Sequence, residues 1–138
     1  MPRFSQRSQD RLNTCHPDLV RLFTEVIKHY DCTILEGQRT PERQAELVRQ
    51  GKSKTLKSKH LVTPLSLAVD AIPYPISWDR QARERMRHFA GFVFGVASQL
   101  GMAGRTRWGG DWSNDVWTKP DGLRDQNFMD LPHYELKL

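Results

Sequence analysis

The segment SLAVDAI, residues 66–72, says most about the fold, because it is short, largely apolar and enclosed by Pro64 and Pro73. A run of this kind between prolines is typical of a buried β-strand. Three further runs favour strands: residues 32–35, 105–108 and 133–138. We therefore predict a small sheet that contains segment 66–72 as a buried strand.

Three segments around these strands are predicted to be helical. Apolar residues recur at helical spacing over residues 18–30 and again over residues 77–100. Between them, Thr40 is a typical N-cap residue, Pro41 suits the first helical position and Gly51 is a stop signal. Because helices and strands are mixed without a βαβ rhythm, the predicted fold class is α+β.

The composition indicates one folded domain with a basic surface. The chain has 138 residues, and its 21 Lys and Arg against 16 Asp and Glu give a formal net charge of +5. A basic chain attracts polyanions such as nucleic acid, acidic membranes or anionic envelope polymers. The same charge also serves solubility, so charge alone does not choose among these partners.

Nothing in the sequence resembles an export signal or a membrane span. Residues 1–10 are polar, and the longest strongly apolar run, residues 90–97, is far too short to cross a bilayer. Cys15 and Cys32 match neither a disulfide framework nor a zinc spacing, so we expect both to stay reduced. We expect a protein that is not integral to a membrane and that stays in the cytoplasm until something else releases it.

Two of the five histidines lie in a context that suggests metal binding. His60 closes a basic loop just before the strand that contains Asp70, and His133 opens the last predicted strand, three residues after Asp130. A catalytic zinc site takes three protein ligands and keeps one position open for water. His60, Asp70 and His133 would supply that set, with Asp130 as general base. No short metal-binding motif links these residues, so spacing alone leaves a structural role open.

Five short motifs, taken together, resemble a known family. Residues 58–60 (SKH), 68–70 (AVD) and 130–135 (DLPHYE) are similar to the signature of zinc peptidases that cleave peptidoglycan stem peptides. This group includes phage L-alanyl-D-glutamate endolysins, D-alanyl-D-alanine carboxypeptidases and D-alanyl-D-alanine dipeptidases. Residues 37–40 (GQRT) and 108–112 (WGGDW) resemble the phage endolysin branch. The five motifs occur in the family's order and span most of the chain.

The resemblance implies a site and a fold. One zinc ion per chain would be bound by His60, Asp70 and His133. Asp130 would be the catalytic base, and Arg39 would point into the site, where a fixed guanidinium holds a carboxylate or the developing oxyanion. Ser58 would contact the substrate. The family fold is a small antiparallel sheet flanked by helices, which agrees with the α+β prediction.

One departure from the family pattern concerns the spacing of the first two ligands. Residues 61–69 separate His60 from Asp70, a longer interval than is usual, and Thr63-Pro64-Leu65 stands where the family has a glycine. We expect the extra residues to loop out while both ligands keep their places.

Lysines and tryptophans near these motifs admit two interpretations. The loop lysines are Lys52, Lys54, Lys57 and Lys59. They either form a solvated surface or attract anionic envelope polymers and substrate carboxylates. Trp108 and Trp112 bracket Asp111; the tryptophans either pack in the core or form a wall of the cleft, in which Trp108 and Asp111 bind substrate. Trp78 and Trp117 are predicted to pack.

These observations favour a zinc-dependent endopeptidase that hydrolyses the L-Ala–D-Glu bond of peptidoglycan and lyses the cell wall. Residues 1–138 would form a single catalytic domain without a separate wall-binding domain, and we expect a monomer. A D-alanyl-D-alanine carboxypeptidase or dipeptidase is the alternative within the family. A non-catalytic, basic nucleic-acid-binding protein is the alternative outside it, although no nucleic acid is expected as partner.

Overall fold

The computed structural model describes residues 1–114 and 129–137. Its sheet has four antiparallel strands in the order β1-β2-β4-β3. The strands are β1 (Cys32–Glu36), β2 (Ala68–Pro73), β3 (Thr106–Gly109) and β4 (Asp130–Leu136). Because the sheet is small and helices flank it, the predicted α+β fold is confirmed.

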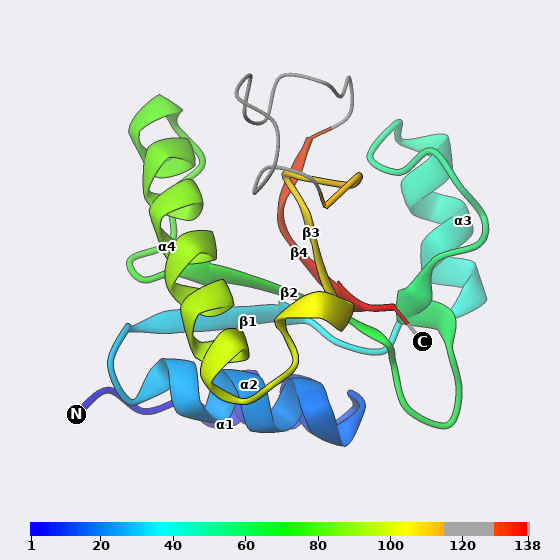
Figure 1. The fold of residues 1–138 in the computed structure, drawn as a ribbon. Helices are drawn as coiled ribbons and strands as arrows, with labels where there is room; N and C mark the ends of the chain where they lie inside the picture. Colours follow the sequence, from blue (N-terminus) through cyan, green and yellow to red (C-terminus); the bar gives the residue numbers. More distant parts are fainter. Residues whose placement is uncertain (115–128, 138) are drawn as a thin grey trace.

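Helices flank this sheet on more than one side (Figure 1). They are α1 (Gln6–Leu12), α2 (Pro17–Ile27), α3 (Pro41–Arg49) and α4 (Arg80–Gln99), with short 3₁₀ helices η1 (Lys59–Leu61) and η2 (Ala103–Arg105). Helix α4 packs on α2 and contacts β2, β3 and β4. Helices α3 and α4 lie on opposite sides of β3 and β4, so the two are well separated.

Most predicted elements are present, with shifted ends that have local causes. Helix α4 begins at Arg80 rather than near residue 77, because the Asp79 side chain accepts a hydrogen bond from the Ala82 amide (2.8 Å) and caps the helix there. Helix α1 was not predicted, since its sequence QRSQDRL has no apolar period; Leu12 alone anchors it in the core. Strand β4 begins at Asp130, three residues before the predicted start.

The apolar face of the sheet forms the core. Tyr134 of β4 is fully buried, and its ring meets Phe23 of α2 and Phe89 of α4 edge-on, at centroid distances of 5.4 and 6.3 Å. Side chains alternate between the two faces of a strand. His133 and Glu135, the neighbours of Tyr134, therefore project to the opposite face, where the candidate site lies.

Both cysteines are free and buried. Burial raises the pKa of the Cys15 and Cys32 thiols to about 12, so neither is a reactive thiolate at neutral pH.

Among the residues that the structure describes, no helix combines the length and the apolar character that a bilayer span requires.

Candidate active site

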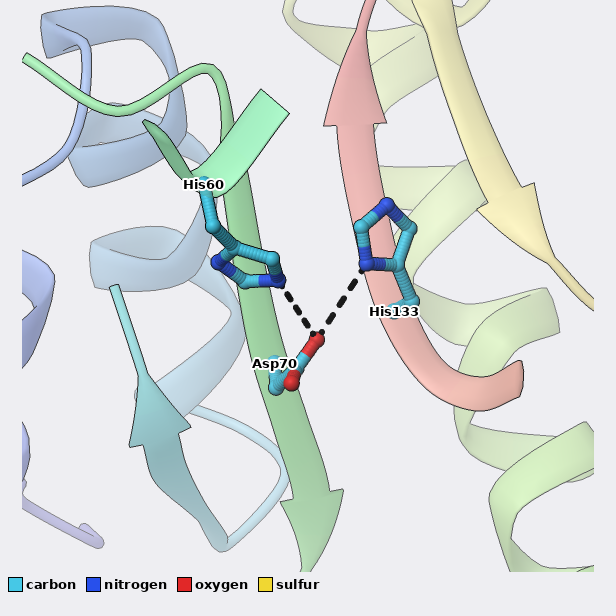
Figure 2. A group of neighbouring side chains, drawn as sticks. All are labelled: His60, Asp70 and His133. Carbon is cyan, nitrogen blue, oxygen red and sulfur yellow. Dashed lines mark hydrogen bonds and ion pairs between the residues drawn. The ribbon is translucent and has the colours of Figure 1, made fainter. Parts of the chain in front are cut away.

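Three side chains from distant parts of the chain meet on the polar face of the sheet (Figure 2). Asp70 of β2 and His133 of β4 are direct cross-strand neighbours, and His60 comes from η1. Asp70 Oδ1 lies 3.2 Å from His60 Nε2 and 3.3 Å from His133 Nδ1. One ligand atom from each residue falls within 4.8 Å of the others. Two imidazoles and a carboxylate are a donor set used by catalytic zinc sites.

The orientation of His60 is fixed by its backbone surroundings. Its Nδ1 lies 2.7 Å from the Gly37 carbonyl oxygen, which can only accept, so Nδ1 carries the proton and Nε2 faces Asp70. The Ser58 hydroxyl accepts a hydrogen bond from the His60 amide (3.2 Å). Gly37 has no room for a side chain, since a Cβ there would collide with the Arg11 carbonyl and the Thr14 hydroxyl. The glycine of GQRT therefore holds the first histidine in place.

The orientation of His133 is fixed by Glu135, a role that sequence reasoning missed. His133 Nε2 lies 2.8 Å from Glu135 Oε1, and a carboxylate can only accept, so Nε2 carries the proton and Nδ1 faces Asp70. Glu135 is itself held by Arg107, at 2.6 Å, and by Lys59, at 3.3 Å. Side chains two residues apart on a strand lie on the same face, and this alternation could have predicted that His133 and Glu135 are neighbours.

A local irregularity brings Asp130 to the same side as His133. Residues three apart on a regular strand face opposite sides. Here Trp108 pairs with Tyr134 while the next residue, Gly109, pairs with Asp130, so β4 contains extra residues at this point. Asp130 Oδ2 consequently lies 3.9 Å from His133 Nδ1. A Cβ at Gly109 would collide with the Asp130 carbonyl, so this close approach requires glycine.

The charges in the cluster depend on one another. Burial alone would raise the pKa of Asp70, but His60 and His133 lower it well below its usual range. Burial and the Asp70 carboxylate raise the pKa of Asp130 to about 6. Burial alone would lower the pKa of His133, but its hydrogen bonds to Asp70 and Glu135 raise it to about 9. The cluster thus favours a positive charge at the point where the ligand atoms meet.

Arg39 lies at the site but is engaged by its own partners. Its guanidinium contacts both carboxylate oxygens of Glu36, at 2.6 and 2.9 Å, and donates to Gln44 Oε1 at 2.6 Å. Arg39 Nη2 is 3.7 Å from Asp70 Oδ2. Glu36 and Gln44 give Arg39 a structural reason for its position that the sequence did not reveal.

The extra residues between His60 and Asp70 loop out, as expected. The Gln38 side-chain amide donates to the carbonyls of Val62, at 2.9 Å, and Pro64, at 3.2 Å. Downstream, the Leu67 amide donates to the Lys59 carbonyl (3.1 Å) and closes the loop. With this loop in place, His60 Nε2 and Asp70 Oδ1 still meet at 3.2 Å.

The cluster lines a cleft of about 920 Å³. Asp130, Arg39 and Ser58 line the same cleft. The four loop lysines also line it: Lys52, Lys54, Lys57 and Lys59. They are therefore placed to meet a substrate, although Lys59 is already paired with Glu135.

The tryptophans that line the cleft are only partly the ones that were predicted to do so. Trp112 lines the cleft, with its ring centroid 5.3 Å from that of His133. Trp108 is buried and donates from Nε1 to the Leu131 carbonyl (2.7 Å), and neither it nor the buried Asp111 is among the cleft residues. Trp78, predicted to pack, is exposed and lines the cleft, because it belongs to the loop that precedes α4. Trp117 lies outside the described residues.

Nearly the whole chain matches one family of known proteins. The model of the family described as phage L-alanyl-D-glutamate peptidase matches residues 1–137. The chain belongs to this family. A solved crystal structure, that of the Serratia marcescens L-Ala D-Glu endopeptidase ChiX, is also similar, with 31% sequence identity and a TM-score of 0.70 over 96% of this chain and 88% of that chain. A comparison with curated protein sequences finds no match.

Family membership makes the protein an enzyme of the peptidase class. It confirms the resemblance based on the five motifs and favours that interpretation over the nucleic-acid-binding alternative.

Proposed function

We propose that this peptidase is a zinc-dependent endopeptidase that hydrolyses the L-Ala–D-Glu amide bond of peptidoglycan. The observation that carries the proposal is the His60–Asp70–His133 cluster with Asp130 beside it in one cleft. The family and the structural neighbour support the choice of bond.

The residues of the cluster fit a zinc ion. Each histidine presents one nitrogen to the centre and uses the other in a hydrogen bond, to Gly37 or to Glu135, an arrangement common to metal-binding histidines. His60, Asp70 and His133 would hold the ion. When bound, zinc supplies a Lewis acid for the amide carbonyl and lowers the pKa of its water to about 7.

Asp130 is the proposed general base. With a pKa raised to about 6, its carboxylate is largely ionised at neutral pH yet basic enough to accept a proton from the attacking water. The same carboxyl group then returns a proton to the leaving amine of D-Glu. Its position 3.9 Å from His133 keeps it beside the reacting centre.

Cationic side chains of the cleft are proposed to hold the acidic part of the substrate. The stem peptide beyond L-Ala carries free carboxylates on D-Glu and often on the third residue. Arg39 and the lysine loop line the cleft on the α3 side and offer positive charge to these groups. The bacterial cell wall is then the partner of this basic surface.

Digestion of purified peptidoglycan tests the proposal. Mass analysis of the fragments should reveal new D-Glu amino termini, while L-Ala stays on the muramic acid. Protein stripped of metal by a chelator is the control, and added zinc should restore cleavage. Release of free D-Ala alone would contradict the endopeptidase assignment and favour the carboxypeptidase alternative.

A further inference from the structure

Trp78 is an exposed aromatic residue in the wall of the active-site cleft. Its side chain is 61% exposed, whereas Trp108 in the core is 5% exposed. Trp78 lines the same cleft as the His60–Asp70–His133 cluster. An exposed indole in the wall of a cleft offers an apolar face to a ligand, because ligand sites are lined mainly by apolar and aromatic side chains.

The segment that carries Trp78 is held at both ends. Upstream, the Arg85 guanidinium donates to the carbonyls of Tyr74, at 2.7 Å, and Pro75, at 3.3 Å. Downstream, Asp79 caps α4 through the Ala82 amide. The backbone around the indole is therefore already ordered, which lowers the entropic cost of binding a ligand there.

The two sides of the cleft differ in character. On the α3 side, Arg43, Lys52 and Lys57 line the cleft, and no ion pair within residues 1–114 and 129–137 engages them. Helix α4 and the segment before it contribute Trp78 and Met86 to the lining, with one cation, Arg83. Helices α3 and α4 lie on opposite sides of β3 and β4 (Figure 1), so the cationic residues and Trp78 reach the cleft from different elements.

The proposed substrate has the same asymmetry. On the D-Glu side of the scissile bond it carries carboxylates, which suit the cationic α3 side. On the other side a single L-Ala joins the bond to the uncharged muramic acid, and one residue spans only about 3.5 Å. A substrate that places its carboxylates toward α3 therefore directs its sugar toward α4.

We infer that Trp78 is a sugar-binding residue of the cleft, and that its indole stacks on a pyranose ring of the glycan strand next to the stem peptide. The inference rests on the proposed function, because that function supplies the direction of the substrate. The C–H face of a pyranose is apolar and its edge is polar, which suits an indole that offers both an apolar face and an N–H.

Two substrates that differ only in the sugar test this inference. One is a muramyl peptide; the other is the same peptide with an acetyl group in place of the muramyl group. Trp78→Ala should raise KM for the muramyl peptide by about threefold to tenfold without changing kcat, and should leave KM for the acetyl peptide unchanged. Trp78→Phe should restore most of the loss.

Tyr74→Ala and Ile76→Ala are matched controls. Both side chains are exposed to a similar degree, 58% and 48%, and belong to the same segment, but neither lines the cleft. Both variants should behave like the wild type on both substrates. Equal KM changes on the two substrates, or the same loss in a control variant, would overturn the inference.

A binding measurement separates this inference from the proposed function. In an Asp130→Asn background, titration calorimetry with the muramyl peptide should reveal weaker binding after Trp78→Ala. If the wild-type protein cleaves neither substrate but binding of the muramyl peptide still depends on Trp78, the sugar site stands and the proposed reaction fails. Binding that is indifferent to Trp78→Ala would reject the sugar site.

Discussion

Strand β4 contributes to two regions that differ in almost every physical respect. Tyr134 and Leu136 are fully buried on its apolar face, where contact with α2 and α4 stabilises the fold. His133 and Glu135 face the cleft, also buried, but among charges rather than among hydrocarbon. Buried charges are costly unless each has a partner, and here each one has. Substitutions at alternate residues of β4 should therefore change either the stability of the fold or the catalytic activity, but not both.

The largest expected effect comes from removing both histidines of the cluster. The double variant His60→Ala, His133→Ala should contain no stoichiometric zinc and should lose all hydrolysis, because one carboxylate cannot hold the ion alone. Metal analysis of the purified protein measures this. The double variant His29→Ala, His88→Ala removes two histidines outside the cleft and should keep one zinc per chain. Full zinc occupancy in the first variant would refute the ligand assignment.

On the apolar face, Phe89→Ala should act on stability alone. Loss of the ring that packs on Tyr134 should cost about 3–5 kcal/mol of unfolding free energy, measured by urea denaturation. Under conditions where the variant is folded, its zinc content and kcat should match the wild type. If a folded Phe89→Ala protein loses its zinc, the two faces are not independent.

Asp130→Asn should separate metal binding from proton transfer. The amide has the shape of the carboxylate but cannot take the proton from water, so we expect kcat to fall by at least about a hundredfold. Zinc content and melting temperature should remain close to those of the wild type. An active variant would indicate that another carboxylate of the cleft, such as Glu135, is the base.

Glu135→Gln should weaken zinc binding to a smaller extent. Its carboxylate orients the His133 ring, and loss of such a partner typically costs about 10- to 100-fold in metal affinity. Competition with a chelator of known affinity gives the dissociation constant. Glu46→Gln, which removes a carboxylate of α3, is the control. Unchanged affinity in Glu135→Gln would mean that the position of His133 is set by the fold alone.

The smallest effect is expected at Tyr134, where the substitution should be favourable. Its buried hydroxyl has no hydrogen-bond partner among the described residues. Tyr134→Phe removes that unsatisfied group and should raise the unfolding free energy by about 1 kcal/mol. A melting curve should shift upward by a few degrees with kcat unchanged. A lower melting temperature would show that the hydroxyl is satisfied in solution.

The sequence was most informative where local chemistry determines local structure. The N-cap Thr40, Pro41 and the apolar periods predicted α3, α2 and α4, and the run around Asp70 predicted β2. The ligand candidates came from residue types next to predicted strands and from the family resemblance. The structure brings all three of them together.

What the sequence could not predict depends on contacts between distant segments. The irregular pairing of Gly109 with Asp130 is a property of two strands, not of either one. The partners of Arg39 and the link from Lys59 to Glu135 form only once α3, η1 and β4 have come together. Trp78 was predicted to pack because tryptophan is highly buried on average. Because Asp79 caps α4, Trp78 lies in the loop just before the helix, where its side chain is exposed.

The close contact between Gly109 and Asp130 constrains how this protein can change in length. A residue deleted between Asp130 and His133 would either move Asp130 away from His133 or shift the end of β4 by one position. Such a shift would send His133 and Glu135 to the core face and Tyr134 to the cleft face. The loop between His60 and Asp70 is under no such restriction, since it lies outside the strands and carries three exposed residues, Val62, Thr63 and Pro64. Insertions and deletions should therefore be tolerated in the loop between His60 and Asp70. Between Asp130 and His133 they should abolish activity.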